Sequence, residues 1–146
     1  RSRVCEALEN DLHATHVDKS QLLEESDVVM LILPYTKDTH HIIGERELSQ
    51  MKSRSVLVNI ARGGIVDDAA LIKALRDKTI FAAGLDVYEG EPQLNPEFLE
   101  LENVVLSPHI GSASEPTRRA MAMTAAKNLV AVLANNEAPI NPVNST

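Results

Sequence analysis

Val28-Val29-Met30-Leu31-Ile32-Leu33 forms an unbroken apolar run that stops at Pro34. A run of this kind predicts a strand that is covered on both faces, as the strands of a parallel sheet are. Further apolar segments at residues 55–59, 81–87 and 104–106 predict three more strands. The sequence therefore predicts a sheet of mostly parallel strands.

Helical patterns separate these predicted strands. Asp18 or Ser20 caps a helix that runs through residue 25, and Gly44 precedes a short helix through Gln50. The next helix begins at Asp67 or Asp68, and the residues on its apolar side are Leu71, Ile72 and Leu75. Alternation of strands with helices predicts an α/β fold with a doubly wound parallel sheet.

The two ends of the chain carry further patterns. Residues 3–10 predict a helix and residues 14–17 predict a short strand. Residues 116–135 predict a long helix that is rich in Ala and Met and apolar around most of its circumference. Because such a helix has little polar face, we expect it to be buried against another domain or subunit.

Composition excludes several classes of function. The chain has 146 residues and a formal net charge of -7, which argues against binding along a nucleic-acid backbone. No apolar run reaches the length needed to span a bilayer. Cys5 is the only cysteine, so an intrachain disulfide and a thiolate metal cluster are both excluded. We therefore expect a cytoplasmic protein with no nucleic-acid or membrane partner.

An arginine follows the predicted strand at residues 55–59, within Asn59-Ile60-Ala61-Arg62-Gly63-Gly64. Arginine presents a rigid fork of donors that binds a carboxylate through two hydrogen bonds. An isolated arginine beside two glycines more commonly occupies a surface position next to a turn. A binding role therefore depends on what lies near Arg62.

Acidic and imidazole side chains follow the next two predicted strands. Asp86, Glu89 and Glu91 lie in one loop, and His109 follows the strand at residues 104–106. Taken singly, such an acidic loop is more often merely solvated, and a lone histidine is more often structural. Parallel strands bring their carboxyl ends to one edge of the sheet, however, so we expect Arg62, Glu91 and His109 to lie together. Arg62 then holds a substrate carboxylate, His109 protonates a carbonyl oxygen, and Glu91 favours the charged form of His109.

The other four histidines have no comparable context. His13, His16 and the pair His40-His41 lack both metal-site spacing to carboxylates and a place at a strand end. We therefore predict no metal site.

Four segments together resemble the D-isomer-specific 2-hydroxyacid dehydrogenases, in the order and at the spacing of that family. The resemblance covers essentially all 146 residues. Within the family, the sequence is most similar to glyoxylate/hydroxypyruvate and 2-ketogluconate reductases. Glu91 disfavours the formate dehydrogenases of this fold, which carry Gln there. The segments are Leu31-Ile32-Leu33-Pro34-Tyr35-Thr36, Asn59-Ile60-Ala61-Arg62-Gly63-Gly64, Gly84-Leu85-Asp86-Val87-Tyr88-Glu89-Gly90-Glu91-Pro92 and Ser107-Pro108-His109-Ile110-Gly111.

The resemblance implies a Rossmann-like fold, a nicotinamide cofactor, a small 2-oxo acid as substrate and a homodimer. It implies Arg62, Glu91 and His109 as catalytic residues and Asp86 as a carboxylate near the nicotinamide. It further implies that residues 1–112 form part of a cofactor domain and that residues 113–146 pack on a substrate domain. The implied cofactor-binding residues are Arg1, Ser2, Arg3, Pro34, Ile60, Ala61, Arg62, Asp86, His109, Gly111 and Ser112.

One motif of the family is missing, since no G-x-G-x-x-G turn occurs in the sequence. The resemblance places Arg1 just after the second strand of the cofactor domain. We therefore expect a fragment that lacks the first strand-turn-helix unit, and we expect it to be a poor enzyme alone. Arg1 and Arg3 stand where an acidic residue binds the ribose of NAD, which favours NADP and leaves NAD open.

The sequence leaves three alternatives open. The same family includes transcriptional corepressors that bind nucleotide with little turnover, and phosphoglycerate dehydrogenases are a rival within the enzyme class. A purely structural fragment is a third alternative. Turnover of small 2-oxo acids separates these alternatives.

Overall fold

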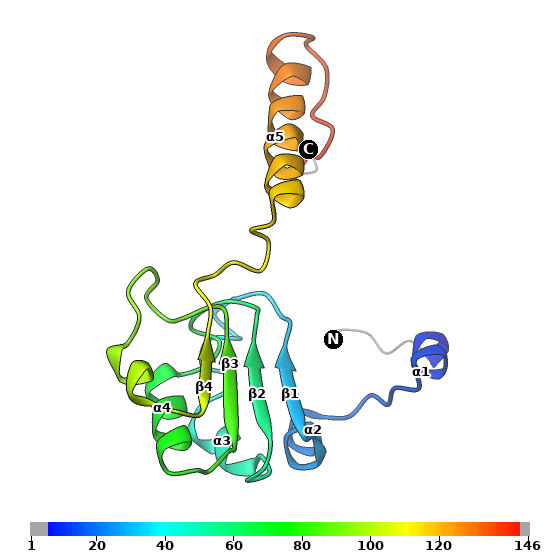
Figure 1. Cartoon of the computed structure of the whole chain (residues 1–146). Helices are drawn as coiled ribbons and strands as arrows, with labels where there is room; N and C mark the ends of the chain where they lie inside the picture. The colour runs from blue at the N-terminus through cyan, green and yellow to red at the C-terminus, as the bar shows by residue number, and fades with distance from the viewer. Residues whose placement is uncertain (1–5, 144–146) are drawn as a thin grey trace. The chain divides into compact units, whose positions relative to one another are not determined.

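The computed structural model describes residues 6–143, without the side chains of Glu6 and Leu8. The chain divides into two compact units, Arg1–His109 and Ile110–Thr146. The first unit contains a four-stranded sheet in the order β1-β2-β3-β4, with helices packed beside it (Figure 1). The predicted α/β fold is confirmed.

All three strand pairings are parallel. The strands are β1 (Val28–Leu31), β2 (Val56–Asn59), β3 (Ala82–Leu85) and β4 (Val104–Leu106). Strands β1, β2 and β3 are shorter than the apolar segments from which they were predicted. In β1 the pairing stops at Leu31, and Ile32 beyond it is 75% exposed.

Helix α2 (Lys19–Glu25) precedes β1, α3 (Glu45–Gln50) connects β1 to β2, and α4 (Asp68–Arg76) connects β2 to β3. The Asp18 side chain accepts a hydrogen bond from the Gln21 N–H, and that of Asp67 accepts one from the Ala70 N–H. Asp18 and Asp67 are therefore the capping residues, each satisfying a backbone donor that the first helical turn leaves unpaired.

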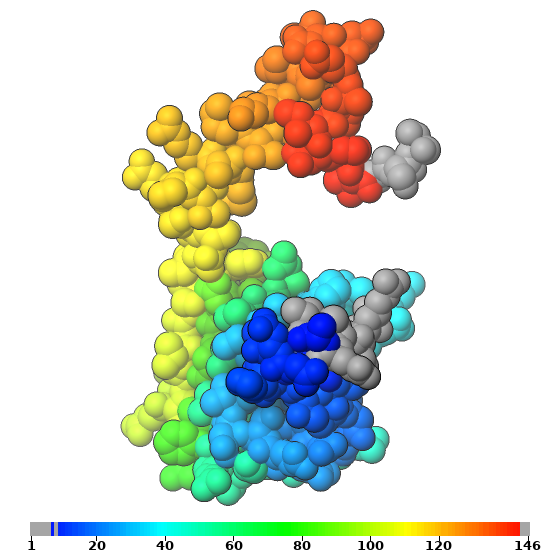
Figure 2. Space-filling view, turned by 90° about the vertical axis from the view of Figure 1, so that its right-hand side faces the viewer, coloured from blue at the N-terminus to red at the C-terminus, as the bar shows by residue number. Residues whose placement is uncertain are grey.

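The core lies on one face of the sheet. Every second strand residue is buried there, and the set is Val29, Leu31, Leu57, Asn59, Ala83 and Leu85. The five apolar members of this set pack with apolar side chains of α2, α3 and α4. Figure 2 shows the outer surface of the unit that contains this core. On the opposite face Val28, Met30 and Val105 are more than half exposed. The described residues thus cover one face of the sheet well and leave the other largely open.

Two predictions of local structure need correction. Residues 14–17 form no strand, because an extended segment needs a hydrogen-bonded neighbour and this one is exposed beside the short helix α1 (Glu6–Leu12). A 3-10 helix, η1 (Pro96–Glu100), was not predicted; the Asn95 side chain caps it, and it buries Phe98 completely.

The second unit contains helix α5 (Glu115–Leu133), which the Ser114 side chain caps. After the helix the chain returns along it, and the Asn141 N–H donates to the Asn128 side chain at 3.1 Å. Within this unit only Ala131 of α5 is buried, so its apolar side chains are exposed in the described chain. No helix among the described residues combines the length and apolar character needed to cross a membrane.

Phe98 and Leu99 offer a matched test of the core. Phe98 is 0% exposed and its ring meets Tyr88 edge to face, whereas Leu99 is 71% exposed. Phe98→Ala should lower the free energy of unfolding by about 3–5 kcal/mol because it leaves a cavity. Leu99→Ala should change that free energy by less than about 0.5 kcal/mol. Denaturant unfolding of the full chain measures both, and equal losses would contradict this account of the core.

Candidate active site

The loops that follow the strands surround one cavity at the carboxyl edge of the sheet. This cavity has a volume of about 750 Å³. Arg62, Glu91 and His109 all line it, and each comes from a different strand end. Three of the predicted cofactor-binding residues, Pro34, Ile60 and Ala61, line it as well. The structure thus brings together residues as distant in the sequence as Ile32 and His109.

His109 and Glu91 form a direct pair across this edge. His109 Nδ1 lies 2.7 Å from Glu91 Oε2, and Glu91 Oε1 accepts a hydrogen bond from the Tyr88 N–H at 2.8 Å. Burial raises the pKa of the Glu91 carboxyl, but these two hydrogen bonds and the charge of His109 together lower that pKa below its ordinary value. At neutral pH Glu91 is a carboxylate, and it accepts a hydrogen bond from a proton-bearing Nδ1 of His109.

The backbone of His109 adopts an unusual conformation. Its φ angle is 51°, in the left-handed region that side-chain-bearing residues seldom occupy. The His109 N–H donates to the Ser107 carbonyl at 3.0 Å. The hydrogen bond to Glu91 and the Ser107 contact hold His109 in this conformation, and such strain is often found at functional positions.

Arg62 is positioned by a buried asparagine at the end of β2. Asn59 is 2% exposed; its side chain accepts from the Ala61 N–H at 3.1 Å and donates to the Arg62 carbonyl at 3.2 Å. These two bonds fix the turn between β2 and the glycines. The guanidinium of Arg62 donates to the Ala61 carbonyl and remains exposed toward solvent. In the sequence, Asn59 is a polar residue at the end of an apolar strand. That position could have indicated a structural role, but no such role was predicted.

Asp86 lies at the end of β3 and is buried. The Ser107 hydroxyl donates to Asp86 Oδ1 at 2.5 Å, which ties the loop after β3 to the end of β4. The Tyr88 hydroxyl supports the same junction by donating to the carbonyls of Leu85 and Ser107. Burial raises the pKa of Tyr88, so this hydroxyl stays a donor at neutral pH.

Gly63 allows the loops after β2 and β3 to touch. A Cβ atom at this position would lie 1.7 Å from the Tyr88 carbonyl oxygen, a distance no side chain can tolerate. The loop that carries Arg62 therefore packs backbone against backbone on the loop that carries Glu91. Only glycine permits such an approach.

The buried carboxyl group of Asp68 holds the loop that carries Glu89 and Glu91. Asp68, at the start of α4, accepts the Glu89 N–H at 3.0 Å and is 7% exposed. Burial raises the pKa of Asp68 to about 6. The sequence pattern indicated Asp68 only as a helix cap and gave no sign of this contact.

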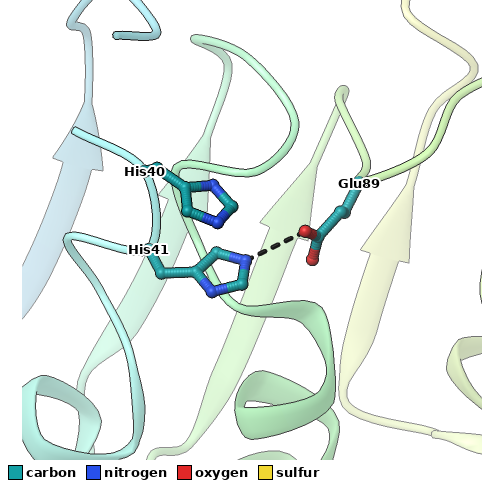
Figure 3. Close-up of side chains that lie close together, drawn as sticks. All are labelled: His40, His41 and Glu89. Atoms are coloured by element: carbon teal, nitrogen blue, oxygen red, sulfur yellow. Dashed lines mark hydrogen bonds and ion pairs between the residues drawn. The ribbon is translucent and has the colours of Figure 1, made fainter. Parts of the chain in front are cut away.

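The structure gives His40 and His41 neighbours that the sequence did not indicate. His41 Nε2 lies 2.9 Å from Glu89 Oε1, and the two imidazole rings stack with centroids 3.8 Å apart (Figure 3). This arrangement could not be predicted from local spacing, because Glu89 is 48 residues from His41 in the sequence. The two residues meet because the loops after β1 and β3 lie at the same sheet edge.

The remaining predicted cofactor-binding residues are not placed at the cavity. Asp86 does not line it, and its buried side chain accepts a hydrogen bond from Ser107 instead. Arg1, Ser2 and Arg3 lie outside the described residues. Gly111 and Ser112 belong to the second unit. Their predicted contacts stay predictions.

An all-parallel sheet carries at its carboxyl edge a histidine paired with a carboxylate, an arginine and an apolar wall. In open α/β sheets this edge is the ligand-binding edge. Fold and site together define a Rossmann-like, nucleotide-binding α/β domain.

Comparison with known proteins identifies the family. Residues 1–111 match the NAD-binding domain of D-isomer-specific 2-hydroxyacid dehydrogenases. The chain is 51% identical over 144 residues to the glyoxylate reductase of Thermococcus litoralis, covering 99% of this chain and 43% of that protein. The chain therefore belongs to the D-isomer-specific 2-hydroxyacid dehydrogenase family, as its four motifs predicted.

Two other relatives are consistent with this family assignment. Glyoxylate/hydroxypyruvate reductase B of Enterobacter agglomerans is 51% identical over 130 residues, or 88% of this chain and 40% of that protein. The NADPH-dependent glyoxylate/hydroxypyruvate reductase of Sinorhizobium meliloti, solved with NADP and malonate, is 38% identical with a TM-score of 0.82. The match covers 89% of this chain and 40% of that structure. The chain thus spans less than half the length of these relatives.

Gly63→Ala tests the contact between the two loops. The new methyl group would clash with the Tyr88 carbonyl, so we expect the free energy of unfolding to fall by about 1–3 kcal/mol or more. Gly44→Ala is the matched control, because its nearest atoms would be 3.8 Å away; it should cost less than about 1 kcal/mol. Denaturant unfolding of both variants decides the point, and a Gly63→Ala chain as stable as Gly44→Ala would refute the close approach.

Proposed function

We propose that the whole protein carrying this chain reduces a small 2-oxo acid to the D-2-hydroxy acid, using a nicotinamide dinucleotide. The substrates we favour are glyoxylate, hydroxypyruvate and 2-ketogluconate. The observation that carries the proposal is the His109–Glu91 pair, which lines the same cavity as Arg62. The names of the relatives from Thermococcus litoralis and Enterobacter agglomerans support it.

Each of the three residues has a distinct task in this reaction. Arg62 binds the substrate carboxylate through its exposed guanidinium. His109 donates a proton from Nε2 to the carbonyl oxygen, because its Nδ1 is occupied by Glu91. Glu91 orients the imidazole and balances its positive charge. The lowered pKa of Glu91 suits this task, since only the ionised carboxylate supplies the balancing charge.

The residues at the cavity fit a nicotinamide ring. Pro34, Ile60 and Ala61 form an apolar wall beside the polar groups of Arg62 and His109, which is the usual composition of a cofactor pocket. When bound, the reduced cofactor supplies the hydride that no side chain can donate. Asp86, held by the Ser107 hydroxyl, would lie at the nicotinamide end.

We further propose NADP as the preferred cofactor. Arg1 and Arg3 provide two guanidinium groups that suit the additional phosphate of NADP. The NADPH-dependent relative from Sinorhizobium meliloti supports the same choice.

We also propose the domain division at residues 112 and 113, with α5 packed on a substrate domain of the whole protein. The exposed apolar side chains of α5 support a covering partner. The homodimer and the cytoplasmic location stay predictions.

Turnover of the whole protein tests the proposed function. Oxidation of NADPH and of NADH is followed by absorbance with glyoxylate, hydroxypyruvate and 2-ketogluconate in turn. We expect rapid turnover of at least one of them, faster with NADPH. Tight nucleotide binding without turnover of any of the three would overturn the reductase and favour a nucleotide-binding role instead.

Variants of the cavity residues test their separate tasks. His109→Ala should lower kcat by about 10²–10⁴-fold with little change in nucleotide binding, because it removes the proton donor. Arg62→Ala should raise KM and lower kcat together, because the substrate carboxylate is held in both ground and transition states. His16→Ala and Arg54→Ala, both exposed and away from the cavity, are the matched controls. Wild-type kinetics in His109→Ala and Arg62→Ala would show that the site is assigned wrongly.

A further inference from the structure

A second histidine–carboxylate cluster lies beside the loop that carries Glu91. Figure 3 shows His40 and His41 with their rings face to face and the Glu89 carboxylate directed toward them. One potential ligand atom from each of the three residues lies within 4.8 Å of the other two. None of these residues lines the cavity of Arg62 and His109.

The Nδ1 atoms of both histidines already have oxygen neighbours. His40 Nδ1 lies 3.1 Å from the Tyr35 hydroxyl, and His41 Nδ1 lies 3.9 Å from Asp67 Oδ2. Only the His40 contact is within hydrogen-bond distance, and metal-binding histidines usually hydrogen-bond one ring nitrogen to an oxygen while the other binds the ion. This contact leaves Nε2 of His40 as its ligand atom, and Nε2 of His41 faces Glu89 at 2.9 Å.

The local charge favours a divalent cation. Glu89, Asp67 and Asp68 place three carboxyl groups around two imidazoles. Among residues 6–143, no lysine or arginine forms an ion pair with any of the three. A bound dication would supply positive charge beside these carboxyl groups.

Backbone contacts fix the segments that carry the ligands. The His40 N–H donates to the Thr36 carbonyl at 3.0 Å, and the His41 N–H donates to the Gly64 carbonyl at 2.8 Å. His41 has a φ of 48°, so its side chain leaves the turn in a direction that ordinary backbone would not give. On the opposite side Asp68 holds the Glu89 N–H. Backbone contacts thus hold both segments independently of the ligand side chains.

We propose that His40, His41 and Glu89 bind one divalent transition-metal ion of the zinc class. Two imidazole nitrogens and one carboxylate oxygen suit Zn²⁺ or Co²⁺, whereas Ca²⁺ and Mg²⁺ prefer oxygen ligands alone. The ion replaces the hydrogen bond between His41 and Glu89, and water completes a tetrahedral shell. Such an ion links the loop after β1 to the loop after β3.

Calorimetric titration of Zn²⁺ into the metal-free full chain tests the site, in a Cys5→Ser background so that the thiol does not compete. We expect one ion per chain and at least about tenfold weaker binding in each of His40→Gln, His41→Gln and Glu89→Gln, the loss expected from removal of a ligand or of a group that orients one. Co²⁺ should give the intense visible absorption of a tetrahedral complex, and the same variants should lose it.

Matched controls separate this site from adventitious binding. His13→Gln and His16→Gln remove exposed histidines elsewhere, and His109→Gln removes the other histidine–carboxylate pair; all three should keep wild-type Zn²⁺ affinity. If His41→Gln fails to fold, His40→Gln and Glu89→Gln carry the test, because both side chains are exposed. Absent Zn²⁺ binding, or binding that depends on a control histidine, overturns the proposal.

Discussion

Leu31, Asn59, Leu85 and Leu106 end their strands side by side, because the parallel register pairs each with the next. Every loop that leaves the sheet after these residues starts from one edge. Side chains that are distant in sequence therefore converge there without any long connecting structure. A slip of the register by one residue would turn the buried Leu57 toward the open face and bury its neighbours instead. The burial of one sheet face thus fixes the register, and the register fixes where the site residues lie.

Loops that merely start from the same sheet edge would be flexible. A set of short contacts between and within these loops restricts their movement. Asn59 closes the turn before Arg62, Gly63 lies against the Tyr88 carbonyl, and the Ser107 hydroxyl binds Asp86. The first contact fixes the turn after β2, and the other two join the loop after β2 to the loop after β3 and the loop after β3 to the end of β4. A reaction that needs an acid, an anion-binding group and a hydride donor in one geometry benefits from such rigidity. The strained φ of His109 can persist because the surrounding contacts hold it.

The sequence predicted the features that depend on periodicity and on strand ends. The four strands, the main helices and the meeting of Arg62, Glu91 and His109 follow from apolar runs and the parallel-sheet rule. The meeting of His41 with Glu89 also takes place at this edge, but His41 lies well beyond the end of β1 in a turn with a left-handed backbone, and no periodic pattern places it there. The strand expected at residues 14–17 failed for a related reason: local propensity says nothing about whether a hydrogen-bonding neighbour exists.

Two carboxylates of one short loop, Glu89 and Glu91, each contact a histidine from a different strand end. Glu91 also accepts a backbone hydrogen bond, which strengthens its ionised form, whereas the Glu89 backbone is held through Asp68. A single residue separates the two, so one short loop presents carboxylates to two different strand ends. Asp68 holds the Glu89 backbone and the Tyr88 N–H holds the Glu91 side chain, so each carboxylate has its own anchor. Separate anchors allow one loop to serve two histidines, because neither contact has to be broken for the other to form.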